Sequence, residues 1–129
     1  MKCTILGSGT WGTALGQVLA DNGNNVTIYG IDKDEVNDIN NHHKNSKFFG
    51  DEVVLPHLIT ATTDLKEALK ETELIIVAVP SNAYRNVLNL VLPLLDKKVH
   101  IVSVAKGFDP LTLKRMSEVV RDVIPNEYR

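Results

Sequence analysis

The sequence contains a single cysteine, and it has no apolar stretch long enough to cross a membrane. Cys3 has no partner for an internal disulfide, and its place in a short apolar segment favours a buried core residue over a reactive thiol. A membrane-spanning helix needs roughly 20 consecutive apolar residues. Residues 3–6 are too short for a signal peptide, and glycines follow them at once. We therefore expect a cytoplasmic protein without a membrane span.

The sequence also lacks a strong excess of charge of either sign. Its 14 Lys and Arg residues against 16 Asp and Glu residues give a net charge of −2. Nucleic acid and acidic membranes are therefore poor candidates for partners. The 43% hydrophobic and 23% charged residues are ordinary for a globular protein, and 129 residues suit one domain with a real core. We expect residues 1–129 to form a single domain.

The familiar patterns of metal-binding and nucleophilic residues are missing. His42 and His43 are adjacent, which is not the spacing of two ligands on one helix face, and no Cys or acidic residue stands at a suitable interval. His57 and His100 are expected to be structural or exposed. No Ser/His/Asp or Cys/His arrangement stands out. The sequence therefore predicts no metal site and no catalytic nucleophile.

Short apolar segments alternate with amphipathic stretches along the chain. Strands are predicted at residues 3–6, 26–29, 74–79 and 100–105, with a weaker candidate at 58–60, and helices at 11–22, 33–43, 65–70, 84–95 and 111–124. Residues 74–79 are apolar at every position, which is typical of a strand covered on both faces in a parallel sheet. The alternation predicts an α/β fold of the Rossmann type, a doubly wound, mainly parallel sheet with helices on both faces.

Two of these helices carry clear local signals. The first has Leu15, Val18 and Leu19 at helical spacing, on one face. In the third, Asp64 and Glu67 have the spacing of a capping pair.

The last helix and one connection are predicted from composition. Asp109 and Pro110 fit the N-cap and first position of the helix at 111–124. Residues 40–56 are polar and predict an extended or flexible connection, either a functional loop or, on position alone, a surface excursion.

Gly7-Ser8-Gly9-Thr10-Trp11-Gly12 follows the first strand and opens the first helix. In such a turn Gly7 permits the tight bend, Gly9 lets a pyrophosphate approach the backbone, and Gly12 lets the helix pack closely on the strand. The free N–H groups and the dipole of the helix start then favour phosphate. A glycine-rich turn without a ligand is the alternative, but the strand before and the helix and strand after favour a dinucleotide-binding turn.

Asp32 lies at the end of the second predicted strand, twenty positions after Gly12. A carboxylate there accepts hydrogen bonds from the adenosine ribose and repels a 2′-phosphate, which favours NAD over NADP. The alternative is that Asp32 caps the helix that starts at Lys33, and the two roles are compatible. Lys33 would soften the repulsion.

Two further turns follow predicted strands, where ligands gather in an open α/β sheet. The turn at Pro80 either lines the nicotinamide side of a cofactor or caps a helix through Ser81 or Asn82. Lys106, followed by Gly107, either meets a phosphate or an ionised substrate or is a solvated surface lysine.

Four segments together carry a resemblance to a known family. They read GSGTWGTAL at residues 7–15, N-x-x-H-x-N-x-x-F at residues 40–48, VAVPS at residues 77–81 and SVAKGFD at residues 103–109. The first is shared with many dehydrogenases. The four in this order and spacing resemble the N-terminal half of bacterial NAD(P)-dependent glycerol-3-phosphate dehydrogenase.

The resemblance implies reversible hydride transfer between dihydroxyacetone phosphate and sn-glycerol 3-phosphate, whose product feeds phospholipid synthesis. It implies cofactor contacts from Thr10 and Trp11, from Ile31 and Asp32, and from Lys106, which would also reach the substrate. NADP-using members often carry basic residues where this chain has Ile31 and Asp32. The expected cofactor is therefore NAD, with NADP as the alternative.

The chain also departs from the family pattern. Phe48-Phe49-Gly50 replaces an aromatic-Leu-Pro segment, and Ala105 replaces a common hydroxyl residue. The family has a helical second domain with the catalytic lysine, beginning shortly after the position of Arg129, so we expect no catalytic residue in this chain. The resemblance implies that a full-length parent is a homodimer. The alternatives are the cofactor domain of another 6-phosphogluconate-dehydrogenase-like oxidoreductase and a non-catalytic dinucleotide-binding module.

Overall fold

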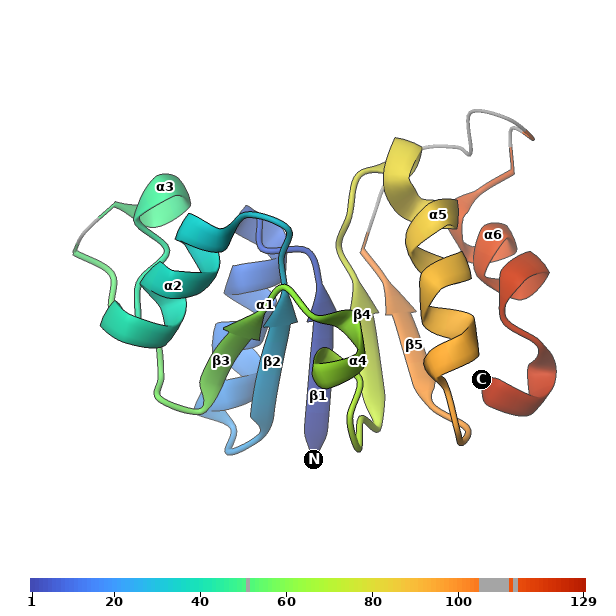
Figure 1. Cartoon of the computed structure of the whole chain (residues 1–129), viewed down its shortest axis with the longest axis horizontal. Coiled ribbons are helices and arrows are strands. Elements are labelled where there is room, and N and C mark those ends of the chain that lie inside the picture. Colours follow the sequence, from blue (N-terminus) through green and yellow to red (C-terminus); the bar gives the residue numbers. More distant parts are fainter. Residues whose placement is uncertain (51, 105–111, 113) are drawn as a thin grey trace.

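The computed structural model describes residues 1–50, 52–104, 112 and 114–129. Five parallel strands form one sheet in the order β3-β2-β1-β4-β5 (Figure 1). The strands are β1 (Lys2–Leu6), β2 (Asn25–Tyr29), β3 (Ile59–Thr62), β4 (Leu74–Val77) and β5 (His100–Ser103). All five predicted strands are present, although β3 begins later than expected and β4 ends earlier. The chain winds outward from β1 to β3 and then crosses to β4, so the strand order reverses between β1 and β4.

Helices connect the strands. They are α1 (Thr10–Asp21), α2 (Lys33–His42), α3 (Ser46–Phe49), α4 (Leu65–Ala68), α5 (Ser81–Val91) and α6 (Met116–Val123), with 3₁₀ turns at Leu92–Leu94 and Asn126–Tyr128. The predicted start of the last helix at residue 111 is wrong, because α6 begins at Met116, where the side chain of Glu118 accepts the backbone N–H of Arg115 at 3.2 Å. The cap expected from Asp109 and Pro110 lies outside the described residues.

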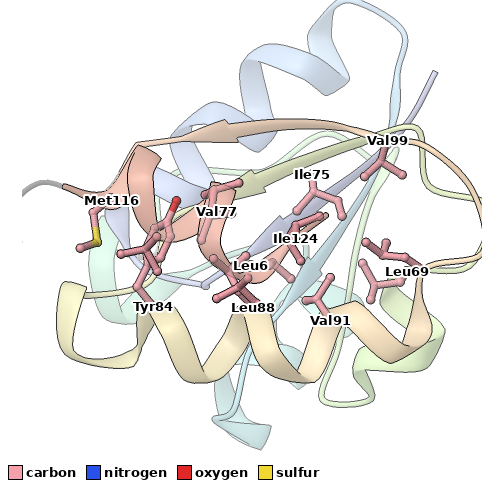
Figure 2. Packing of buried hydrophobic residues seen from close by; sticks show 14 of the residues in the cluster. Leu6, Leu69, Ile75, Val77, Tyr84, Leu88, Val91, Val99, Met116 and Ile124 are labelled. Carbon is pink, nitrogen blue, oxygen red and sulfur yellow. The ribbon is translucent and has the colours of Figure 1, made fainter. Parts of the chain in front are cut away.

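Two apolar clusters on opposite faces of the sheet form the core. Leu6 and Val77 belong to one cluster, together with side chains from α4, α5 and α6, and Figure 2 shows how Leu88 of α5 points toward these strands. Ile5 belongs to the other, with side chains from α1, α2 and β2. Successive residues of β1 thus face opposite sides. This arrangement confirms a doubly wound sheet with helices on both faces.

Helix α1 lies close against the sheet because its inner face is made of small residues. The buried residues of this helix are Gly12, Thr13, Gly16 and Ala20. A Cβ on Gly16 would lie 3.1 Å from Cδ1 of Ile5. Val18, from the apolar face predicted for this helix, is 57% exposed. The side chains of α1 that face the sheet are small, because a larger side chain would push the helix and its N-terminal turn away from β1.

Residues 40–56, predicted to be an extended or flexible connection, are folded back over α2 where they are described. They contain α3, and the backbone N–H of Leu55 donates to the carbonyl of His43. Leu55 is buried, and Asn40 exchanges two hydrogen bonds of 2.8 Å with the backbone of Ala61. This packing brings α3 beside the N-terminal turn of α1.

Candidate functional site

The glycine turn after β1 is closely packed underneath and open above. Gly7 has φ +120°, and a Cβ there would lie 2.8 Å from the carbonyl oxygen of Ala78. A Cβ on Gly12 would overlap the carbonyl oxygen of Gly7. By contrast, a Cβ on Gly9 would meet no atom within 4 Å. The structure therefore leaves open space over the backbone at Gly9, where a pyrophosphate is expected to lie.

Helix α1 begins without the side-chain cap that α2 and α4 have. Asp32 and Asp64 each accept backbone N–H groups at the starts of α2 and α4. All residues of α1 belong to the described part of the chain. Gly9 at the N-cap of this helix offers no side-chain acceptor, and its first turn holds no acidic residue. The first N–H groups of α1 therefore have no intrahelical acceptor, and the helix dipole adds a partial positive charge. Such a terminus favours an anionic ligand.

A cavity of about 1020 Å³ lies at the carboxyl edge of the sheet, beside the glycine turn. Six of the predicted site residues line it: Gly7, Ser8, Gly9, Trp11, Ile31 and Pro80. Trp11 is 72% exposed and Ile31 is 87% exposed. Large apolar side chains left in contact with solvent at a cavity rim are typical of a surface that a ligand covers. Thr10 and Gly12 lie in the same turn but do not line this cavity.

One wall of the cavity was not anticipated from the sequence. Ala83, Val87 and Leu90 of α5 line it, and Leu90 is 57% exposed. These residues are four and three positions apart directly after the turn at Pro80, which places them on one face of a helix. This spacing was the available signal for a cavity wall, but it also fits a helix packed in the core. The expectation that Ser81 or Asn82 caps α5 is wrong, because Pro80 occupies the N-cap position and no side chain caps the helix.

Two buried side chains hold the glycine turn from below. The hydroxyl of Ser8 donates to Oε2 of Glu35 at 2.5 Å. The side-chain amide of Asn45, which is 1% exposed, donates to the carbonyl oxygen of Ser8 and to Oγ1 of Thr13, both at 2.9 Å. Asn45 thus ties α3 to the turn. From the sequence, Asn45 was expected only as part of a motif that resembles a known family, and Glu35 was not expected to contribute.

Asp32 lies at the end of β2 as predicted. Its Oδ1 accepts from the backbone N–H groups of Asp34 at 2.9 Å and Glu35 at 3.4 Å. Its Oδ2 lies 3.8 Å from Nζ of Lys47. The helix-capping role is therefore confirmed, and the ribose contact stays a prediction. Lys106 and Gly107, the other predicted contact, lie outside the described residues.

Asp38 ties α2 to α3 and should make the loop sensitive to acid. Its Oδ2 accepts the backbone N–H of Ser46 at 2.9 Å, and this bond lowers the pKa of Asp38, with a smaller contribution from His42. The stabilisation is therefore present at neutral pH and is lost as the pH falls through the lowered folded-state pKa. We expect Asp38→Ala to lower the free energy of unfolding by about 1 kcal/mol at pH 7.

Urea unfolding of both proteins between pH 7 and 3 measures this difference. The difference should shrink as the pH falls below the ordinary aspartate pKa, because Asp38 is then protonated more readily in the unfolded chain than in the folded one. A difference that stays the same down to pH 3 would show that the charge of Asp38 is not what holds the loop.

Across the described ranges, none of the helices has the length and apolar character needed to cross a bilayer. In the same part of the chain, no three His, Cys, Asp or Glu side chains are grouped as ligands for a metal ion.

An open parallel sheet with a glycine turn and an uncapped helix at its switch point defines a dinucleotide-binding domain of the Rossmann class. Residues 2–129 match the family described as "NAD-dependent glycerol-3-phosphate dehydrogenase N-terminus". The chain belongs to this family. A glycerol-3-phosphate dehydrogenase [NAD(P)+] of Streptococcus uberis is 44% identical over 128 residues, which are 99% of this chain and 38% of the relative. The chain thus spans well under half the length of the curated relatives it matches.

Solved structures give the same assignment. Glycerol-3-phosphate dehydrogenase from Coxiella burnetii superposes with a TM-score of 0.88 at 32% sequence identity, over 95% of this chain and 37% of that one. D-mandelate dehydrogenase, solved with NADH and anilino(oxo)acetate, has a TM-score of 0.71 at 25% identity, over 99% of this chain and 39% of that one. The first similarity lies within the family, and the second extends to another NADH-binding dehydrogenase.

Proposed function

We propose that residues 1–129 form one NAD-binding domain of a glycerol-3-phosphate dehydrogenase, which reversibly reduces dihydroxyacetone phosphate to sn-glycerol 3-phosphate for phospholipid synthesis. The observation that carries the proposal is the open backbone at Gly9, at the uncapped start of α1 and beside a cavity of about 1020 Å³. These features fit a dinucleotide, because its pyrophosphate needs backbone N–H donors and close approach. Bound NAD would supply the hydride acceptor and donor of the reaction.

The proposed contacts follow the shape of the cavity. The N–H groups of Thr10, Trp11 and Gly12 would hold the pyrophosphate above Gly9. The exposed side chain of Ile31 would cover the adenosine end, where Asp32 would accept the ribose hydroxyls.

The other end of the cavity suits the nicotinamide. Pro80, together with the apolar wall of α5, would exclude water from the nicotinamide side. By the family resemblance, Lys106 would contact both cofactor and substrate.

NAD is proposed as the preferred cofactor, with NADP as the weaker ligand. The support is the carboxylate of Asp32 at the end of β2, where a 2′-phosphate would meet a negative charge. The structural similarity to D-mandelate dehydrogenase solved with NADH is consistent with this proposal. We further propose a cytoplasmic location, supported by a single cysteine that cannot form an internal disulfide, and a homodimeric full-length parent.

The 129-residue chain should bind the cofactor without catalysing the reaction. Its relatives are more than twice as long, and we propose that substrate binding and catalysis depend on the part of such a protein beyond the matched region. Calorimetric titration with NADH should give saturable one-to-one binding. A dihydroxyacetone phosphate reduction assay on the same sample should give no turnover above background. Robust turnover, or no binding of NADH, would contradict the proposal.

A further inference from the structure

A second, smaller cavity is lined in part by Asp32. It has a volume of about 370 Å³ and is lined by residues of α2 and α3 and those that precede them: Asp32, Asp34, Glu35, Asp38, Asn45, Ser46 and Lys47. Under the proposed function, the 2′ position of the adenosine ribose would point toward this cavity. Its four carboxylates and one ammonium group give it a net negative charge.

Three backbone N–H donors around this cavity already have carboxylate acceptors. Those of Asp34 and Glu35 donate to Oδ1 of Asp32. That of Ser46 donates to Oδ2 of Asp38. A phosphate group is normally held by such backbone N–H groups together with basic side chains. A 2′-phosphate that used these three N–H groups would have to displace their internal hydrogen bonds.

Lys47 is the residue placed to interact with it. Its Nζ lies 3.4 Å from Oε1 of Glu35 and 3.8 Å from Oδ2 of Asp32, and its side chain is 63% exposed. Glu35 is only 8% exposed, and its other oxygen accepts the hydroxyl of Ser8. The carboxylate of Glu35 is thus a buried negative charge. The ammonium group of Lys47 is partly solvated and lies close to the carboxylates of both Glu35 and Asp32.

We propose that Glu35 and Lys47 are specificity-determining residues that, together with Asp32, set the preference of this site for NADH over NADPH. Glu35 adds a second negative charge that disfavours the 2′-phosphate. Lys47 offsets part of that charge and sets how much NADPH the site tolerates. The inference rests on the proposed function, since it requires the adenosine ribose to lie at Asp32.

The test compares dissociation constants for NADH and NADPH at low ionic strength. Lys47→Met should reduce the affinity for NADPH relative to NADH by about 3- to 10-fold. Glu35→Gln keeps an acceptor for the Ser8 hydroxyl and should shift the ratio by a similar factor in the opposite direction. Both shifts should shrink as salt is added, because screening weakens the interaction of partly solvated charges.

Lys70→Met serves as the matched control, because it removes the same charge from an exposed position that does not line this cavity. The ratio should stay at the wild-type value in this variant. Unchanged ratios in Lys47→Met and Glu35→Gln, or an equal change in Lys70→Met, would overturn the inference. A wild-type chain that binds neither dinucleotide would instead refute the proposed function, so the two failures are distinguishable.

Discussion

Replacing Gly9 with alanine is expected to weaken NADH binding by about 10- to 100-fold, which corresponds to roughly 1–3 kcal/mol of steric conflict with the ligand. The physical reason is the open space above the turn. Gly9 has φ −73°, which alanine adopts without strain, and a Cβ there meets no protein atom within 4 Å. The methyl group would therefore occupy only the space proposed for the pyrophosphate.

The fold of this variant should be nearly unaffected. Alanine is a poorer N-cap than glycine, so we expect a loss of about 1 kcal/mol at most in the free energy of unfolding. Titration calorimetry with NADH and thermal unfolding on the same preparation give the two quantities. Wild-type affinity in Gly9→Ala would show that the pyrophosphate does not cross the backbone here.

Whereas Gly9→Ala should mainly weaken NADH binding, replacing Gly12 with alanine should destabilise the fold itself. A Cβ at this position would overlap the carbonyl oxygen of Gly7 and would also lie 3.2 Å from Cγ2 of Ile5. The first neighbour is backbone, which can move only if α1 shifts away from β1. We expect a loss of about 3 kcal/mol, at the upper end of ordinary overpacking effects, and a melting temperature lower by roughly 10 °C.

Gly9→Ala is the matched control for this experiment, because it makes the same chemical change three residues earlier in the same turn. The melting temperatures and the free energies of unfolding of the two variants, measured by thermal and urea unfolding, should therefore differ clearly. Equal stability of Gly12→Ala and Gly9→Ala would mean that α1 does not depend on the close contact at Gly12.

The sequence was enough to predict the sheet and the turn because their signals are local. Residues 74–77 are apolar throughout and form the buried strand β4. The spacing of Gly7, Gly9 and Gly12 is set by the geometry of one turn, and the structure gives each position a different steric environment. Asp32 as a helix cap also follows from a local rule, since its acceptor oxygen serves residues two and three positions later.

The support beneath the turn could not be predicted in the same way, because it depends on contacts between distant segments. Asn45 reaches Ser8 across 37 positions and Glu35 reaches it across 27. Neither contact leaves a periodic pattern in the sequence. The polar composition of residues 40–56 even indicated an extended connection, whereas part of that polarity serves buried hydrogen bonds at Asn45. Tertiary packing decided these positions.

The single tryptophan allows the most direct test of the central claim, that a dinucleotide binds across the glycine turn. Trp11 lies in that turn, lines the cavity and is 72% exposed, so its fluorescence reports on this site alone. Titration of the 129-residue chain with NADH should quench Trp11 saturably, with weaker binding of NADPH and a large loss of affinity in Gly9→Ala. Absence of a saturable change with NADH, or an identical titration in Gly9→Ala, would contradict the claim.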